Sequence, residues 1–146
     1  MTQLLPDPDL SAEERGRYAR HLTLPEFGVS GQQRLKTASV LCVGAGGLGS
    51  PLLLYLAAAG VGRIGIVDDD CVEVSNLQRQ VIHAEGGLGE PKTGSARRRL
   101  LGLNSHCLVD EHACRLTKAN AVELIESHDV VVDGSDNFPT RYLIND

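Results

Sequence analysis

The sequence predicts an α/β fold in which a doubly wound, mostly parallel sheet carries helices on both faces. The first observation behind this prediction is that short apolar segments typical of buried strands alternate along the chain with longer helical patterns. The second is a glycine-rich turn between the first of these strands and the helix that follows it. Such units join parallel strands through right-handed crossovers, which place helices on both sides of the sheet.

Helical patterns occupy the chain ahead of the first predicted strand. Ser11 and Glu14 have the spacing of a capping box, which predicts a helix over residues 11–24. A second, shorter helix is predicted over residues 30–38. The sequence therefore predicts an N-terminal helical segment over residues 1–38.

The remaining residues, 39–146, are expected to form one Rossmann-like domain. The predicted elements are a strand over 39–44, a helix over 48–61, a strand over 63–70, a helix over 91–103, a strand over 107–116, a helix over 118–127, a strand over 128–136 and a helix over 139–146. Pro91 and Pro139 fit the first turns of their helices. The last helical pattern stops at Asp146 without a capping signal, so we expect this domain to be incomplete at its C-terminus.

The composition is ordinary for a soluble globular protein, with 42% hydrophobic and 23% charged residues. The net charge of −5 argues against nucleic-acid binding through a basic surface. No apolar run reaches the roughly 18 residues that a membrane span requires. The four cysteines form no C-x-x-C pair, and the first residues do not resemble a signal peptide. We expect a reduced, cytoplasmic protein whose partners include neither nucleic acid nor membrane.

The glycine-rich turn has the pattern G-x-G-x-x-G, formed by Gly44, Gly46 and Gly49. The first glycine permits a tight turn, the second lets the backbone approach a phosphate, and the third packs the helix against the strand. The following helix N-terminus offers unpaired N–H groups and a partial positive charge to an anion. The turn therefore predicts a Rossmann-like nucleotide site.

An acidic residue, Asp68, ends the next predicted strand, where a carboxylate can accept hydrogen bonds from ribose hydroxyls. The neighbouring Asp69 and Asp70 either solvate the loop or lie near a metal ion. An NAD-dependent dehydrogenase and an ATP-binding enzyme predict the same residues up to this point.

The segment after Asp68 distinguishes these two classes. A nicotinamide dehydrogenase has no need of a polar, basic loop there, whereas a triphosphate needs its charges neutralised. Arg79 and Lys92 supply positive charge, and Asn76 and Gln80 supply hydrogen bonds. The segment therefore favours ATP.

Two further carboxylates, Asp133 and Asp136, come at the end of the fourth predicted strand. The carboxyl ends of the strands form the ligand-binding edge of an open α/β sheet. A carboxylate that faces a triphosphate there is suited to holding Mg²⁺.

Five ordered motifs carry a resemblance to a known family. They are R-Y-x-R-H at 17–21, VGAGGLGSP from 43, DDDCVEVSNLQRQ from 68, GEPK from 89 and DGSDN from 133. In this order they resemble the ThiF/MoeB/HesA family, the bacterial relatives of ubiquitin-activating enzymes, which includes adenylyltransferases of molybdopterin and thiamine synthesis. The resemblance extends from about residue 11 to the last residue.

The resemblance implies an adenylyltransferase that uses ATP and Mg²⁺. Family members adenylate the C-terminal glycine carboxylate of a ubiquitin-like sulfur-carrier protein, which ends in Gly-Gly, and release pyrophosphate. By motif, Gly44, Gly46 and Gly49 would contact ATP, Asp68 its ribose, Asn76, Arg79 and Lys92 its phosphates, and Asp136 the Mg²⁺. Arg20, from the R-Y-x-R motif, would reach into the partner protomer's site, which implies a homodimer with Arg20, Arg79 and Lys92 as catalytic groups.

The sequence has no motif for a nucleophilic side chain or a general base, and this activity requires neither. A carboxylate nucleophile is already ionised near neutral pH and needs no general base, so alignment and charge neutralisation suffice.

Zinc is expected in the family, but its two C-x-x-C pairs belong to a region beyond this chain. The alternative interpretation is a truncated relative that binds nucleotide without catalysis. The SNLQRQ and GEPK motifs would have no role in a dehydrogenase, which argues against that class.

Overall fold

The computed structural model describes residues 8–146, and within them the chain forms a four-stranded sheet. The strands are β1 (Ser39–Val43), β2 (Arg63–Val67), β3 (Leu108–His112) and β4 (Val130–Asp133). Their order in the sheet is β3-β2-β1-β4, and every neighbouring pair is parallel. The predicted parallel α/β class is confirmed.

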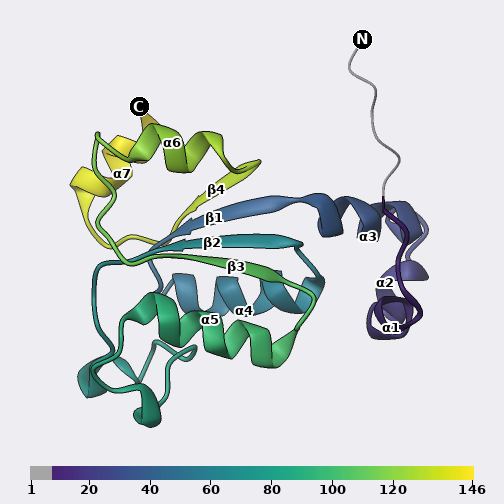
Figure 1. Ribbon diagram of the computed structural model, residues 1–146, viewed down its shortest axis with the longest axis horizontal. Helices are drawn as coiled ribbons and strands as arrows, with labels where there is room; N and C mark the ends of the chain where they lie inside the picture. The colour runs from purple at the N-terminus through teal and green to yellow at the C-terminus, as the bar shows by residue number, and fades with distance from the viewer. Residues whose placement is uncertain (1–7) are drawn as a thin grey trace.

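Helices cover both faces of this sheet (Figure 1). α4 (Gly49–Ala59) and α5 (Lys92–Leu103) lie on one face, and α6 (Ala121–Glu126) and α7 (Phe138–Asn145) lie on the other. None of the helices within residues 8–146 combines the length and the apolarity needed to cross a bilayer. The arrangement is the doubly wound one that the strand–helix alternation predicts.

The two faces bury separate hydrophobic cores, and β1 contributes to both. Val40 and Cys42 belong to the core under α4 and α5, whereas Leu41 and Val43 belong to the core under α6 and α7. This alternation follows from the two-residue period of a strand. Because both faces are covered, β1 is a continuous apolar run rather than an alternating one.

The helix predicted over residues 11–24 is divided into two, α1 (Ala12–Arg17) and α2 (Ala19–Leu22). They meet at Tyr18, where the backbone leaves the helical conformation with φ −100° and ψ 17°. The Tyr18 hydroxyl is buried and accepts a hydrogen bond of 2.7 Å from the side-chain amide of Asn104. This contact joins segments far apart in sequence, so local periodicity could not indicate the break.

The predicted capping box is confirmed. The Glu14 N–H donates to Ser11 Oγ at 3.1 Å, and the Ser11 N–H donates to Glu14 Oε2 at 2.7 Å.

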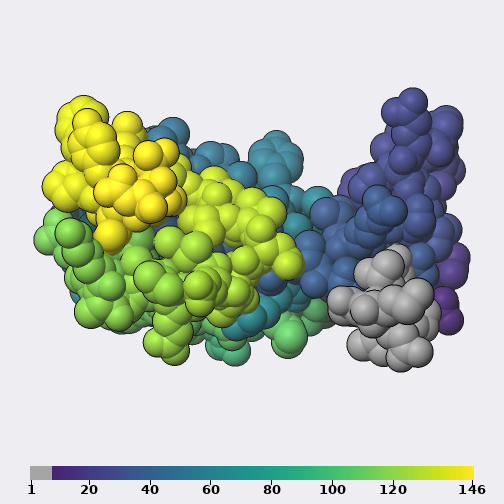
Figure 2. Space-filling view, turned by 90° about the horizontal axis from the view of Figure 1, so that it is seen from above, coloured from purple at the N-terminus to yellow at the C-terminus, as the bar shows by residue number. Residues whose placement is uncertain are grey.

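The next helix, α3 (Gly28–Thr37), begins slightly earlier than predicted and leads directly into β1. The N-terminal helices therefore stand at the amino ends of the strands, at the opposite end of the molecule from α7 (Figures 1 and 2).

The strands end earlier than predicted. β2 stops at Val67, and the carboxylate of the next residue, Asp68, accepts hydrogen bonds from backbone N–H groups. β3 and β4 also fall short of their predicted limits at residues 116 and 136. The connection from β2 to α5 contains two short 3₁₀ helices, η1 (Val74–Asn76) and η2 (Glu85–Gly87), which the sequence did not predict.

The strand order positions the site. The chain runs from β1 outward to β2 and β3, then crosses to β4 on the other side of β1. Connections therefore leave the carboxyl ends of β1 and β4 in opposite directions, which opens a crevice between them. In open α/β sheets ligands bind at such a switch point.

Candidate nucleotide-binding site

A pocket of about 720 Å³ lies at the carboxyl ends of β1, β2 and β4. The residues predicted for the nucleotide that line it are Gly44, Gly46, Asp68, Arg79, Gln80, Lys92 and Asp136. Gly49 and Asn76, also predicted for the nucleotide, do not line it. The fold thus brings together residues from four separate motifs of the sequence.

The glycine turn joins the end of β1 to α4 through close backbone contacts. Gly44 has φ +99°, a left-handed conformation, and a Cβ there would lie 2.7 Å from the Gly134 carbonyl oxygen. Both observations require glycine at this position. Gly49 is buried against Gly44 and has a packing role, as predicted for the third glycine.

The middle of the turn faces the pocket. Gly46 and Gly47 line it, and their N–H groups donate to no acceptor in the described part of the chain. These groups precede the N-terminus of α4, whose dipole adds partial positive charge. The turn can therefore bind an anion such as a phosphate.

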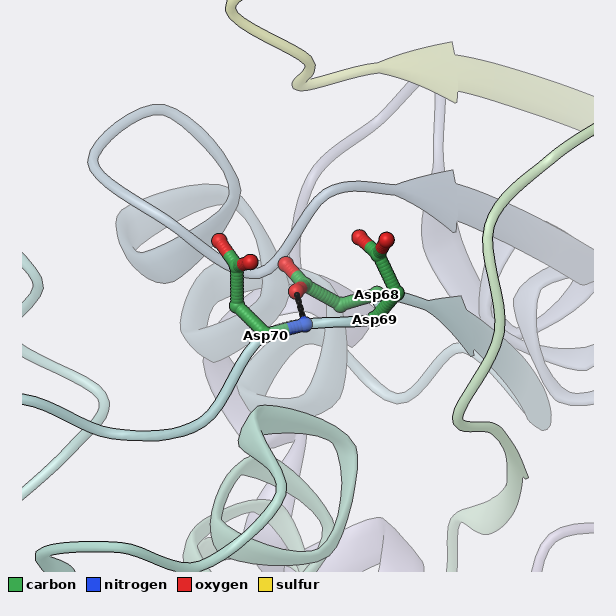
Figure 3. A group of neighbouring side chains, drawn as sticks. All are labelled: Asp68, Asp69 and Asp70. Carbon is green, nitrogen blue, oxygen red and sulfur yellow. Dashed lines mark hydrogen bonds between the residues drawn. The ribbon is translucent and has the colours of Figure 1, made fainter.

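Asp68 is tied directly to this turn. Its Oδ2 accepts a hydrogen bond from the Ala45 N–H at 2.8 Å, and its Oδ1 accepts one from the Asp70 N–H at 2.9 Å. Figure 3 shows the second of these bonds, with the carboxylates of Asp68, Asp69 and Asp70 on the same side of the chain. One oxygen from each of the three carboxylates lies within 4.8 Å of the other two. Asp68 thus orients the turn while its carboxylate stays at the pocket wall.

Lys92 is the first residue of α5, and its side chain is only 5% exposed. Its Nζ lies 3.1 Å from Asp70 Oδ2, which balances the ammonium charge. A buried ammonium group requires such a partner, because removing a charge from water costs several kcal/mol, roughly. Lys92 therefore brings a fixed positive charge to the pocket.

Arg79 is exposed at the pocket, where its Nη2 donates to Asn76 Oδ1 at 3.4 Å. Asn76 itself lies in η1, outside the pocket. Its side chain contacts Arg79, and the expected contact of Asn76 with phosphate stays a prediction.

The two carboxylates after β4 have different surroundings. Asp133, the last residue of β4, accepts from the Ser135 N–H at 2.9 Å and from Ser135 Oγ at 2.5 Å. Asp136 lines the pocket, is exposed, and makes no hydrogen bond or ion pair within residues 8–146. Its oxygens are therefore available, and an exposed carboxylate beside an anion-binding turn fits Mg²⁺, which prefers oxygen ligands.

Arg20 lies in α2, far from this pocket along the sheet, and its side chain is exposed. It does not line the pocket of its own chain.

Four residues that line the pocket or lie behind it were missed from the sequence. Arg115, in the loop after β3, and Arg141, in α7, add positive charge to the wall, and Arg141 Nη2 donates to the Ser135 carbonyl at 3.0 Å. His83 and Ser95 lie behind the glycine turn and are buried. Arg115 falls inside the strand predicted over 107–116, so its place at the pocket became visible only when β3 was found to end at His112, and no local signal marked the other three.

Burial sets the pKa of two groups behind the pocket. It raises the pKa of the Cys42 thiol to about 12, and the nearby Asp68 and Asp133 carboxylates add to this effect. Burial also lowers the pKa of His83 below its usual range. Cys42 therefore stays a protonated core residue, and His83 is neutral near pH 7.

A doubly wound parallel sheet with a glycine turn after β1 and a carboxylate after β2 defines a Rossmann-like protein. Within this class the chain belongs to the ThiF family, whose model matches residues 18–146.

Similar proteins extend beyond this chain. The probable adenylyltransferase/sulfurtransferase MoeZ of Mycobacterium tuberculosis is 57% identical over 141 residues, which cover 97% of this chain and 36% of MoeZ. The sulfur carrier protein adenylyltransferase of Thermus thermophilus is 57% identical over 134 residues, which cover 92% of this chain and 49% of that protein. The chain therefore spans less than half the length of either relative.

Solved structures share the fold. The tRNA N6-threonylcarbamoyladenosine dehydratase TcdA of E. coli, in complex with ATP, superposes with a TM-score of 0.85 at 26% identity, covering 92% of this chain and 55% of TcdA. E. coli MccB with ATP has a TM-score of 0.77 at 32% identity, covering 88% of this chain and 40% of MccB.

Proposed function

We propose that this protein is an ATP-dependent adenylyltransferase that activates the C-terminal glycine carboxylate of a ubiquitin-like sulfur-carrier protein ending in Gly-Gly. The observation that carries the proposal is the convergence of Asp68, Arg79, Lys92 and Asp136 on one pocket beside the glycine turn. Membership of the ThiF family and similarity to proteins named as adenylyltransferases support it.

In this proposal the glycine turn holds ATP phosphates through its free N–H groups, and Asp68 accepts hydrogen bonds from the ribose hydroxyls. Arg79 and Lys92 neutralise phosphate oxygens, with Asn76 orienting Arg79. Asp136 would hold Mg²⁺, which supplies positive charge to the phosphates.

The reaction is a displacement at the α-phosphorus of ATP. A carboxylate oxygen of the carrier's last glycine attacks the phosphorus, and the bond from the α-phosphorus to the bridging oxygen of pyrophosphate breaks. The products are the carrier acyl-adenylate and pyrophosphate. The charges of Arg79 and Lys92 stabilise the oxygens on which charge develops. The attacking carboxylate is already ionised near neutral pH, so no proton has to be removed from it.

A homodimer completes the proposed site. Arg20 is exposed and lies at the opposite end of the sheet from its own pocket. In the dimer, Arg20 of each protomer reaches the pocket of the other and adds a positive charge there.

The test is ATP–pyrophosphate exchange with Mg-ATP and a carrier that ends in Gly-Gly. Wild-type protein should exchange label, and Arg79→Ala or Asp136→Ala should abolish it. Arg99→Ala is the matched control, because Arg99 is exposed on α5 and does not line the pocket.

Each outcome decides a different claim. Full exchange in Arg79→Ala or Asp136→Ala contradicts the residue roles. Binding of Mg-ATP without exchange in the wild type supports the non-catalytic alternative, a nucleotide-binding relative. Tighter binding of NADH than of ATP contradicts the proposed nucleotide.

A further inference from the structure

His83 lies in the connection between β2 and α5, and both of its ring nitrogens have buried partners. Nε2 lies 2.8 Å from the Ala45 carbonyl oxygen, and Nδ1 lies 2.8 Å from Ser95 Oγ. His83 is 7% exposed, Ser95 3% and Ala45 0%. The ring thus connects the glycine turn to α5 in the interior, behind the pocket.

The partners determine which nitrogen carries the proton. A carbonyl oxygen only accepts hydrogen bonds, so His83 Nε2 must be the donor to Ala45. In the neutral ring Nδ1 is then an acceptor, and the Ser95 hydroxyl donates to it. The Ala45 carbonyl therefore selects the tautomer, and the Ser95 hydroxyl, which can donate to Nδ1, is compatible with it and orients the ring.

Ala45 is held at both of its backbone polar groups. Its N–H donates to Asp68 at 2.8 Å, and its carbonyl accepts from His83 at 2.8 Å. The Ala45 carbonyl and the Gly46 N–H belong to the same planar trans peptide, so they point in opposite directions. Because the carbonyl points inward to His83, the Gly46 N–H points away from it, and Gly46 lines the pocket.

We propose that His83, oriented by Ser95, is a positioning residue that fixes the peptide between Ala45 and Gly46 and so aims the Gly46 N–H at a nucleotide phosphate. We call Asp68, His83 and Ser95, with the peptide groups they hold, the Ala45 clamp. The inference rests on the proposed binding of ATP. In this inference Asp68, His83 and Ser95 hold the turn in its binding conformation before the nucleotide arrives. Binding then does not have to order the turn, which strengthens the affinity for phosphate.

The test compares nucleotides with and without phosphates by calorimetric titration of the whole chain. His83→Leu keeps the volume but removes the donor, and it should weaken Mg-ATP binding about 5- to 10-fold, the range expected for one hydrogen bond. Adenosine, which lacks phosphates, should bind as it does to wild type. His83→Gln returns an N–H donor near Ala45 and should recover most of the ATP affinity, and Ser95→Ala should cause an intermediate loss.

Adenosine binding also reports on the fold of each variant, so general damage is separated from loss of the clamp. Equal weakening of ATP and adenosine in His83→Leu would assign His83 a merely structural role and overturn the inference. Wild-type affinity for ATP in His83→Leu would overturn it as well, with the proposed function intact. If wild-type protein binds adenosine but gains nothing from the phosphates, both the inference and the proposed function are overturned.

Discussion

Gly49 contacts Gly44 through backbone alone: a Cβ atom on Gly49 would lie 1.9 Å from the Gly44 carbonyl oxygen. The first and last glycines of the motif therefore touch each other, and the first turn of α4 rests on the end of β1. No side chain fits between them. This contact, rather than contact with the ligand, explains why the third position must be glycine.

We predict that Gly49→Ala destabilises the fold. The new methyl group meets rigid backbone, so α4 has to move away from β1, and the free energy of unfolding should fall by about 3 kcal/mol or more. Urea denaturation followed by circular dichroism measures this change.

Gly102→Ala is the matched control. Gly102 lies in α5, and a Cβ there meets nothing within 4 Å. Alanine is the better helix former, so this variant should be unchanged or more stable by about 0.5–1 kcal/mol. Equal stability of the two variants would show that the Gly49 contact is looser than described.

The second prediction concerns the salt bridge between Lys92 and Asp70. Asp70→Asn leaves the buried Lys92 ammonium without its counter-charge, and the free energy of unfolding should fall by about 1–2 kcal/mol, less than for a wholly buried pair because Asp70 is largely exposed. ATP phosphates then replace the missing carboxylate. The rise in melting temperature on adding Mg-ATP should therefore be larger in Asp70→Asn than in wild type.

Glu90→Gln is the control for this charge change. Glu90 pairs with Arg98 at 2.7 Å, and the Arg98 side chain is 62% exposed. A surface pair contributes about 0–1 kcal/mol, so both stability and the response to ATP should stay near wild type. A smaller ATP response in Asp70→Asn than in wild type would mean that Asp70 orients Lys92 for the nucleotide and does not compete with it.

The third prediction concerns pH. Burial lowers the pKa of His83 in the folded protein, whereas the unfolded chain takes up this proton near pH 6.5. Between the two pKa values the unfolded state binds more protons, so the contribution of His83 makes the free energy of unfolding fall as the pH drops below about 6.5. His83→Gln removes this titration.

Urea denaturation of wild type and His83→Gln at about pH 7.5 and about pH 5.5 measures the effect. The difference in stability between the two proteins should shift in favour of His83→Gln at the lower pH. A difference that does not change with pH would contradict a neutral, buried His83.

The glycine turn and Asp68 were predictable because both depend on short stretches of chain. A buried strand, a glycine turn, a helix and a second strand follow each other between residues 39 and 67, and local patterns identify all four. Asp136 was predictable as a pocket residue for a similar reason, since it follows a strand that is parallel to β1.

The break at Tyr18 and the contacts of His83 were not predictable in this way. The backbone leaves the helical conformation at Tyr18, whose hydroxyl bonds Asn104 in a different part of the chain. Arg141 reaches the pocket because α7 folds back over the end of β4. Each depends on a partner that only the packed structure supplies.

The sequence by itself determined the parallel α/β class, the anion-binding turn and the carboxylate that follows β2, because strand and helix periodicity and glycine spacing are local properties of the chain. The tertiary structure decided the strand order, which sets β4 beside β1 and closes the pocket with Asp136. It also decided that His83 holds Ala45, since a buried polar group takes the partner that packing brings within reach.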